Sequence, residues 1–399
     1  MKNTKTFRRE PLTDSQLLMT IAVCIFLTMY VGAMLIFKGG FLRANQIFDI
    51  LNDNAPLIIV SCGLTIVMIG GGIDISVGAV TSLVVMACAL FLNNGGNVYL
   101  SMLLAIGIGL GFGLVQGFLI SYLDIQPFIV TLAGMFFARG MTTILSVDPQ
   151  KVNIDPIHNL FETIHRGALV NTSIDLDPQT FNTSTENLTE LVRDGKMTFF
   201  EAIKNMNFRT LLEGKIKIDW LGYTAPNGNR IPASMEYGVV IALLCVVLIF
   251  LLLKFHKLGR GFYAIGGNQT SALMLGINVK RTRFLSYVIC GLLSGISGYV
   301  FLMHTGAGNA TNALGMEMNA IAASIIGGTL LSGGVGNVVG TFFGVMILNT
   351  IKKIVVTSGL NAPWWQSVTT GGMLCFFIIL QSVVIYIRSK LRRRSISKK

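Results

Sequence analysis

Residues 54–92 read NAPLIIVSCGLTIVMIGGGIDISVGAVTSLVVMACALFL, which is two apolar runs joined by the glycine-rich stretch 70–78. Each run approaches the ~20 residues that a helix needs to cross a bilayer. Glycine runs interrupt helices and leave backbone groups free, which a membrane protein tolerates only against other protein or a water-filled cavity. The stretch therefore predicts two membrane helices joined by a break that is lined by protein or water.

The rest of the chain repeats this pattern. Of its 399 residues, 52% are hydrophobic and 13% are charged, which is too much apolar surface for one soluble core. We predict an all-α polytopic membrane protein with two glycine-broken helices. Its ten or so transmembrane segments are expected at 17–37, 54–71, 75–92, 99–120, 127–147, 238–255, 284–304, 316–331, 334–352 and 366–388. The first is interpreted as a retained span, because its apolar core is longer than that of a signal peptide.

The net charge of +12 is unevenly distributed. Seventeen of the thirty-one Lys and Arg residues lie in 1–16, 254–283 and 388–399, whereas 148–237 carries nine basic and twelve acidic residues. The positive-inside rule then places both termini and 254–283 in the cytoplasm and 148–237 outside. The basic tails are expected to lie against anionic membrane lipid, and no nucleic-acid partner is expected. Lys352 and Lys353 fall on the outer side and are the main exception.

These observations divide the chain into three parts. Residues 1–147 form an N-terminal transmembrane half, and 148–237 form an external polar insertion. Residues 238–399 form a C-terminal transmembrane half that contains a cytoplasmic coupling segment, 257–283. Glycines spaced by four on one helix face predict close helix packing, and they are Gly109, Gly113 and Gly117, Gly291 and Gly295, and Gly336, Gly340 and Gly344.

A second break, GGTLLSGGVG at 327–336, mirrors the first in the other half. One broken helix in each half indicates a translocation site near the middle of the membrane. The residues proposed for this pathway are the glycines and polar groups of the two breaks and one further deep charge: Gly71, Gly72, Asp74, Ser76, Ser332, Gly333 and Arg139.

Two alternatives stay open for Asp74, because a carboxylate in uncharged apolar sequence needs a partner, water or a function. It accepts hydrogen bonds from a polar substrate, or it caps the helix that follows. Arg139 either pairs with Asp74 or reaches a segment end. Glu317 and His304 lie near segment ends and are interpreted as interfacial. The six cysteines fall in apolar runs and the four histidines lack ligand spacing, so we expect no metal site.

The phosphate-binding pattern Gly-x-x-x-x-Gly-Lys-Ser/Thr does not occur in the chain. If transport is driven by ATP, the ATPase must be another chain, so this one is not an enzyme by itself. The segment 257–283 is polar enough to leave the membrane and is patterned for a short amphipathic helix, which makes it the candidate docking element. The alternative is an ordinary basic loop.

Several blocks resemble a known family. GRGFYAIGGN at 259–268 is similar to the cytoplasmic motif of sugar ABC-importer permeases of the ribose, xylose and galactose type. The stretch 70–78, QPFIVTLAGM at 126–135, and 325–336 resemble further family blocks. The block 134–140, together with Trp364 and Trp365, looks closest to the galactofuranose-type branch.

The resemblance implies an ABC-importer permease fold and a monosaccharide importer in a bacterial inner membrane. Its partners would be cytoplasmic ABC ATPase subunits, a second permease subunit (homo- or heterodimer) and an external sugar-binding protein. No cofactor is expected in this chain, with ATP and Mg on the partner ATPase. The residues that would couple to the ATPase are Arg260, Phe262, Ile265, Gly266, Gly267, Asn268, Ala272 and Gly276.

Other interpretations remain. The cargo is alternatively a nucleoside or an autoinducer-like compound, and an ion-coupled secondary transporter would also use broken helices and a buried carboxylate. A passive channel is less consistent with a sequence that has no filter motif. The segment 148–237 is longer than the family's external loop, and our hypothesis is that it contacts the binding protein or a neighbouring subunit.

Overall fold

The structure is a computed structural model, and it describes residues 14–37, 41, 45–152, 215–224, 230–360 and 362–396. The first half contains α1 (Asp14–Ile36), α2 (Asn45–Ile69), α3 (Val77–Asn93), α4 (Val98–Ser121) and α5 (Pro127–Leu145). The second half contains α10 (Tyr237–Phe255), α11 (Lys257–Gly267), α12 (Gln269–Met274), α13 (Val279–Thr305), α14 (Met316–Ile326), α15 (Val338–Thr357) and α16 (Pro363–Ile396).

The short strands form two antiparallel pairs. β1 (Gln150–Lys151) pairs with β4 (Ala307–Gly308), and β2 (Lys215–Thr224) pairs with β3 (Arg230–Glu236). Most of the segment 148–237 lies outside the described residues, so its predicted contacts stay a hypothesis.

Eight helices of the described chain are long and apolar enough to cross a membrane, and α3 and α14 are shorter apolar helices. Together they account for the ten segments predicted from the sequence, and the all-α polytopic fold is confirmed. The second break is wider than predicted. The segments expected at 316–331 and 334–352 are separated by a wider interruption, because α14 ends at Ile326 and α15 begins at Val338.

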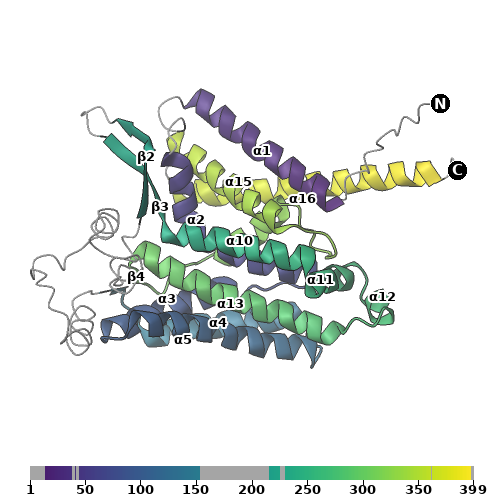
Figure 1. The fold of residues 1–399 in the computed structure, drawn as a ribbon, viewed down its shortest axis with the longest axis horizontal. Coiled ribbons are helices and arrows are strands. Elements are labelled where there is room, and N and C mark those ends of the chain that lie inside the picture. Colours follow the sequence, from purple (N-terminus) through teal and green to yellow (C-terminus); the bar gives the residue numbers. More distant parts are fainter. Residues whose placement is uncertain are drawn as a thin grey trace, which may run out of the picture.

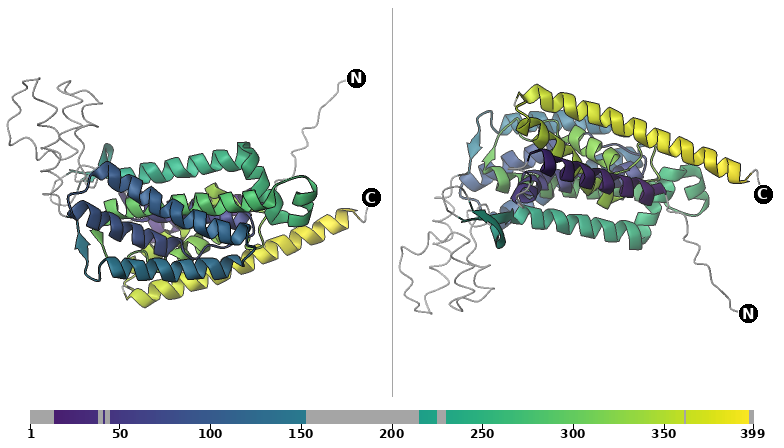
Figure 2. Two further views of the ribbon diagram at one scale, coloured as in Figure 1. Left: turned by 90° about the horizontal axis from the view of Figure 1, so that it is seen from below. Right: turned by 90° about the horizontal axis from the view of Figure 1, so that it is seen from above.

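Helix α2 lies at the centre of the bundle, with 89% of its most apolar stretch buried. The outer faces of α4, α5, α10 and α16 expose large apolar side chains, as expected of helices that face lipid or another membrane subunit. Figure 2 shows α16 running along one side of the bundle and extending beyond it. This distribution places the buried core around α2, α13, α14 and α15.

Glycine faces hold the helices close together, as predicted. A Cβ atom added at Gly109 of α4 would lie 2.3 Å from the carbonyl oxygen of Gly291 in α13. A Cβ atom at Gly340 of α15 would lie 2.0 Å from the carbonyl oxygen of Gly327. Both approaches bring backbone against backbone, which only glycine permits.

The bundle has two distinct ends (Figure 1). Helices α11 and α12, the first turn of α1 and the last turns of α16 lie at one end, which we call the α12 end. The two strand pairs lie at the opposite end, which we call the hairpin end. The basic segment 254–283 and both terminal helices therefore share an end, in agreement with the alternation of segments predicted from the sequence.

Lys352 lies within α15 and is only partly exposed. Its Nζ atom is 3.4 Å from Oδ1 of Asn319 in α14. The lysine that disagreed with the charge rule is therefore part of the helical bundle and has a polar partner there.

Candidate functional site

The first break begins with a helix ending that glycine makes possible. The amides of Gly70, Gly71 and Gly72 donate to the carbonyl oxygens of Ile66, Met68 and Val67. Gly71 has a φ of +79°, a left-handed conformation that favours glycine. The chain then runs without helical structure until α3 begins at Val77.

Asp74 is buried within this break, at 2% exposure. Its Oδ1 atom accepts hydrogen bonds from the amide of Ser76 at 2.9 Å and from the hydroxyl of Ser76 at 2.7 Å. The thiol of Cys290 in α13 lies next to the carboxylate. Asp74 thus closes a local turn on Ser76, the residue that precedes α3, rather than capping an amide of the helix itself.

Ser76 continues this network into the bundle. Nε2 of Gln116 in α4 donates to the Ser76 hydroxyl at 2.9 Å. The Gln116 side chain lies against Gly134 of α5, where an added Cβ atom would come within 2.1 Å of Nε2. Asp74, Ser76 and Gln116 therefore connect the first break with α4 through buried polar contacts, and Gln116 was not identified from the sequence.

Arg139 does not pair with Asp74. Its guanidinium donates to the carbonyl oxygens of Asn312 at 2.8 Å and Ala313 at 3.0 Å. It therefore holds the loop before α14 against α5. The sequence identified Arg139 as an unusual charge, but not the loop that it binds.

Glu317 is buried, at 8% exposure, in the first turn of α14. An added Cβ atom at Gly78 would lie 2.1 Å from its Oε2 atom, and its charge interacts with that of Arg139. The start of α14 therefore packs against the start of α3, and Glu317 is enclosed there rather than exposed.

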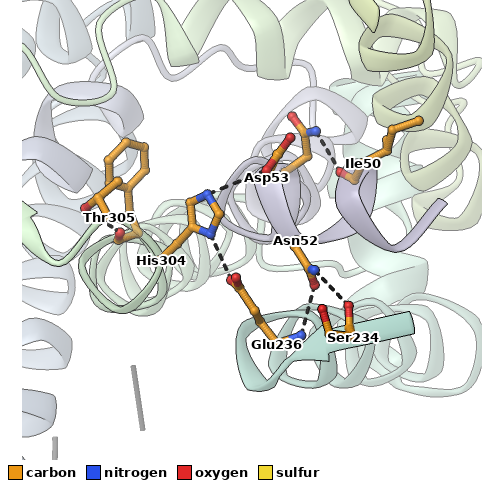
Figure 3. Close-up of polar contacts among 9 residues, drawn as sticks. Ile50, Asn52, Asp53, Ser234, Glu236, His304 and Thr305 are labelled. Atoms are coloured by element: carbon orange, nitrogen blue, oxygen red, sulfur yellow. Dashed lines mark hydrogen bonds and ion pairs between the residues drawn. The ribbon is translucent and has the colours of Figure 1, made fainter. Parts of the chain in front are cut away.

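His304 lies at the hairpin end, at the end of α13 (Figure 3). Its Nδ1 atom is 2.8 Å from Oε2 of Glu236, and its Nε2 atom is 3.8 Å from Oδ1 of Asp53. Asn52 adds a second connection, since it donates to the carbonyl oxygen of Ser234 at 3.0 Å. These contacts fasten β3 to α2 and α13, and within the described residues no group of three or more His, Cys, Asp or Glu could hold a metal ion.

The second break spans 327–337 and contains three glycines with φ between +74° and +94°, namely Gly328, Gly333 and Gly334. The side chain of Asn337 then caps α15 by accepting from the amide of Val339 at 2.9 Å. Ser332 is exposed and Gly333 is buried.

The two breaks are in contact with each other. The amide of Gly334 donates to the carbonyl oxygen of Ile69, the last residue of α2, at 2.9 Å. A Cβ atom added at Gly333 would lie 2.9 Å from Cα of Gly71 and 3.0 Å from Cα of Gly266 in α11. The glycine turns of the two breaks therefore lie beside α11, at the α12 end.

The segment 257–274 forms two helices rather than an ordinary basic loop. His256 caps α11 and Asn268 caps α12, each by accepting a hydrogen bond from a backbone amide. The predicted coupling residues fall into two groups: Phe262, Ile265 and Ala272 are buried against the protein and Gly266 is partly buried, whereas Arg260, Gly267, Asn268 and Gly276 are exposed.

An apolar surface lies at the tip of α12. Leu273, Met274 and Leu275 are 64%, 83% and 78% exposed. Adjacent exposed apolar side chains at the end of a basic segment are typical of a protein-interaction surface. We call these three residues the α12 tip.

Comparison with known proteins agrees with this geometry. A protein-family model described as "Branched-chain amino acid transport system / permease component" matches residues 46–378. The chain is 32% identical over 362 residues to the inner membrane ABC transporter permease protein YjfF of Escherichia coli, covering 90% of each chain. It is 29% identical over 377 residues to the fructose import permease protein FruG of Bifidobacterium longum, covering 93% of each.

The ribose import permease protein RbsC of Escherichia coli is 24% identical over 358 residues, covering 90% of this chain and 92% of that one. No solved structure gives a significant match. The family match includes both breaks and the α11–α12 segment. The chain therefore belongs to this permease-component family, and it is a multi-pass membrane permease of the ABC-importer type, a transport component rather than a catalytic enzyme.

Proposed function

We propose that this permease carries a monosaccharide into the cell and that separate ATPase subunits, which bind ATP and Mg, drive it. The names of several relatives specify fructose, ribose or xylose, and this supports a sugar as the cargo. The galactofuranose-type assignment is a narrower prediction within that proposal. A nucleoside or an autoinducer-like compound is the alternative cargo.

The observation that carries the ATPase part of the proposal is the α12 tip. This chain has no phosphate-binding motif, so an ATP-driven cycle needs a surface on which an ATPase subunit can dock. Met274 in the α12 tip is the most exposed large apolar residue of the described chain, at 83%. Docking of apolar side chains into a cleft of a partner gives affinity, since burying one such side chain contributes about 1.5–3 kcal/mol.

The sidedness follows from charge. The α12 end carries the basic segment 254–283, so this end faces the cytoplasm in the proposal, and the hairpin end faces outward. The external sugar-binding protein would approach the hairpin end. The exposed apolar faces of α5 and α16 suit contact with a second permease subunit, which would complete the assembly.

The pathway residues proposed from the sequence remain candidates. Asp74 and Ser76 are enclosed in this conformation, so contact with a sugar requires α3 to move relative to α4. Arg139 in α5 and Glu317 at the start of α14 supply a second set of polar groups inside the bundle.

The experiment is transport by the reconstituted complex of this permease with its ATPase subunits and binding protein. Proteoliposomes should take up labelled sugar in an ATP-dependent manner that vanadate inhibits. Uptake that persists with vanadate and collapses with a protonophore would support the ion-coupled alternative. Competition by unlabelled ribose, fructose, xylose, galactose and a nucleoside identifies the cargo class.

The variant Met274→Asp tests the docking surface. Its side chain is largely exposed, so the permease should fold and reach the membrane normally. The variant loses an apolar contact and introduces a charge that docking would bury. Both effects should lower co-purification of the ATPase by about tenfold or more. The exposed Leu331→Asp is the matched control, since Leu331 is 46% exposed in the second break and outside the α12 tip. Equal ATPase retention in both variants would contradict the proposal.

A further inference from the structure

Gly266 lies where α11 meets both glycine breaks. A Cβ atom added to it would lie 1.8 Å from the carbonyl oxygen of Ile69 and 2.5 Å from the amide nitrogen of Gly334. These two atoms are themselves joined by a hydrogen bond of 2.9 Å. The backbone of α11 therefore rests directly on the bond that connects the end of α2 with the second break.

Three backbones meet at this point with no side chain between them. Gly71 of the first break, Gly333 of the second break and Gly266 of α11 approach so closely that a Cβ atom at Gly333 would be 2.9–3.0 Å from Cα of each of the others. Side-chain contacts adapt by changing rotamers, whereas backbone contacts between turns and helices do not. A displacement of α11 therefore displaces the backbone of both breaks, with little of it absorbed by side-chain rearrangement.

A hydrogen bond adds a second connection. The Tyr263 hydroxyl of α11 donates to the carbonyl oxygen of Gly336 at 2.9 Å, and Ser15 at the start of α1 donates to the same oxygen at 3.1 Å. Burial raises the pKa of Tyr263 to about 12, so the phenol stays protonated and keeps this donor role. Gly336, at the far side of the second break, is thus bonded to α11 three residues before Gly266.

The elements beyond the breaks are those with buried polar groups. The first break leads within three residues from Gly71 to Asp74, which is connected to α4 and α13. The second break lies between α14, whose first turn carries Glu317, and α15. A displacement at the junction is therefore applied next to α3 and α14, without first passing through the long helices.

We propose that Gly266 is a positioning residue of the transport cycle, through which α11 passes the movement of α12 directly to both glycine breaks. The inference rests on the proposed ATP-driven function. It also changes the role of Gly266 from the one expected from the sequence, where it was assigned to the surface that contacts the ATPase. Gly266 instead faces the permease, and the α12 tip is the part that protrudes.

The decisive variant is Gly266→Ala. Since ordinary contacts begin near 3.4 Å, the added methyl group forces α11 away from the junction by roughly 1.5 Å. The α12 tip is unchanged, so the ATPase should still bind and hydrolyse ATP. We expect the number of sugar molecules imported per ATP hydrolysed to fall by about tenfold. Gly111→Ala is the matched control, because this helical glycine of α4 has open space around it.

A second variant covers the case in which the Gly266→Ala permease fails to fold. Tyr263→Phe keeps the ring and removes only the hydroxyl that binds Gly336. We expect the ATP consumed per imported sugar to rise by about fivefold, with ATPase binding unchanged.

Wild-type transport stoichiometry in Tyr263→Phe, or in a properly assembled Gly266→Ala complex, would overturn the proposal. A wild-type complex that shows no ATP-dependent uptake at all would instead refute the proposed function. A Gly266→Ala permease that folds normally but no longer binds the ATPase would return Gly266 to the docking surface and would also overturn the inference.

Discussion

Asp74 illustrates at the residue scale how the protein accommodates a carboxylate in an apolar environment. The amide and hydroxyl of Ser76 donate to one of its oxygens, and Gln116 in turn donates to that hydroxyl. A buried carboxylate is tolerated only when such donors replace water. The local part of this arrangement follows from the sequence, since Asp74 and Ser76 are two residues apart. Gln116 is forty residues from Ser76, and its contact with Ser76 arises only from the packing of α4.

The substitutions Asp74→Ala and Asp74→Asn separate the structural role from a transport role. Asp74→Ala leaves the buried donors of Ser76 without a partner, and we expect the free energy of unfolding to fall by about 1–3 kcal/mol. Asp74→Asn keeps an acceptor oxygen and should cost less. Thermal unfolding in detergent, followed by size-exclusion chromatography, measures both effects.

Asp124→Asn is the control for these variants, because its carboxylate is 82% exposed and makes only a 3.4 Å contact with Arg283. If Asp74→Asn is as stable as the wild type but abolishes uptake, Asp74 acts on the substrate. If Asp74→Ala is as stable as the wild type, the structural role of its bonds to Ser76 is refuted.

At the scale of elements, the apolar helices were predictable and the shape of the breaks was not. Long apolar runs identify membrane helices because the bilayer sets their length. Residues 327–337 contain Leu330, Leu331 and Val335, so hydropathy alone extends the neighbouring segments into the break. The break itself depends on glycines at positive φ, which composition does not reveal.

The partners of Arg139 and Glu317 also could not be predicted from composition. Each was recognised as a charge within apolar sequence, but their partners come from the loop before α14 and from the start of α3. Sequence periodicity shows which face of a helix is apolar, but not which distant loop covers it. The structure shows that 257–274 is helical, but the sequence alone did not reveal which of the predicted coupling residues are buried and which are exposed.

Glycine spacing gives a testable prediction for two neighbouring positions of α4. Gly109→Ala places a methyl group 2.3 Å from the carbonyl oxygen of Gly291, so α4 and α13 must separate. Gly111→Ala meets open space and adds helix propensity of up to about 1 kcal/mol. We therefore expect Gly109→Ala to lower the unfolding temperature in detergent and Gly111→Ala to leave it unchanged or raise it. Equal effects of the two variants would contradict the packing argument.

At the scale of the whole molecule, the two ends of the bundle are built from different elements. The α12 end brings together the terminal helices, the basic segment and both glycine breaks. The hairpin end carries the strand pairs and the Glu236–His304 contact. Force and cargo would thus enter at opposite ends, and α2, which spans the bundle and is mostly buried, connects them.

The orientation of these ends is open to direct measurement with cysteine labelling. Cys24 and Cys375 are exposed and are first replaced by serine, whereas the other four cysteines are buried. Met274→Cys at the α12 end and Asp148→Cys at the hairpin end then serve as single reporters, since both side chains are exposed. A membrane-impermeant maleimide should label Asp148→Cys in intact spheroplasts and Met274→Cys only in inverted vesicles. The opposite result would place the basic segment outside, and an ATPase in the cytoplasm would then have no access to the α12 tip.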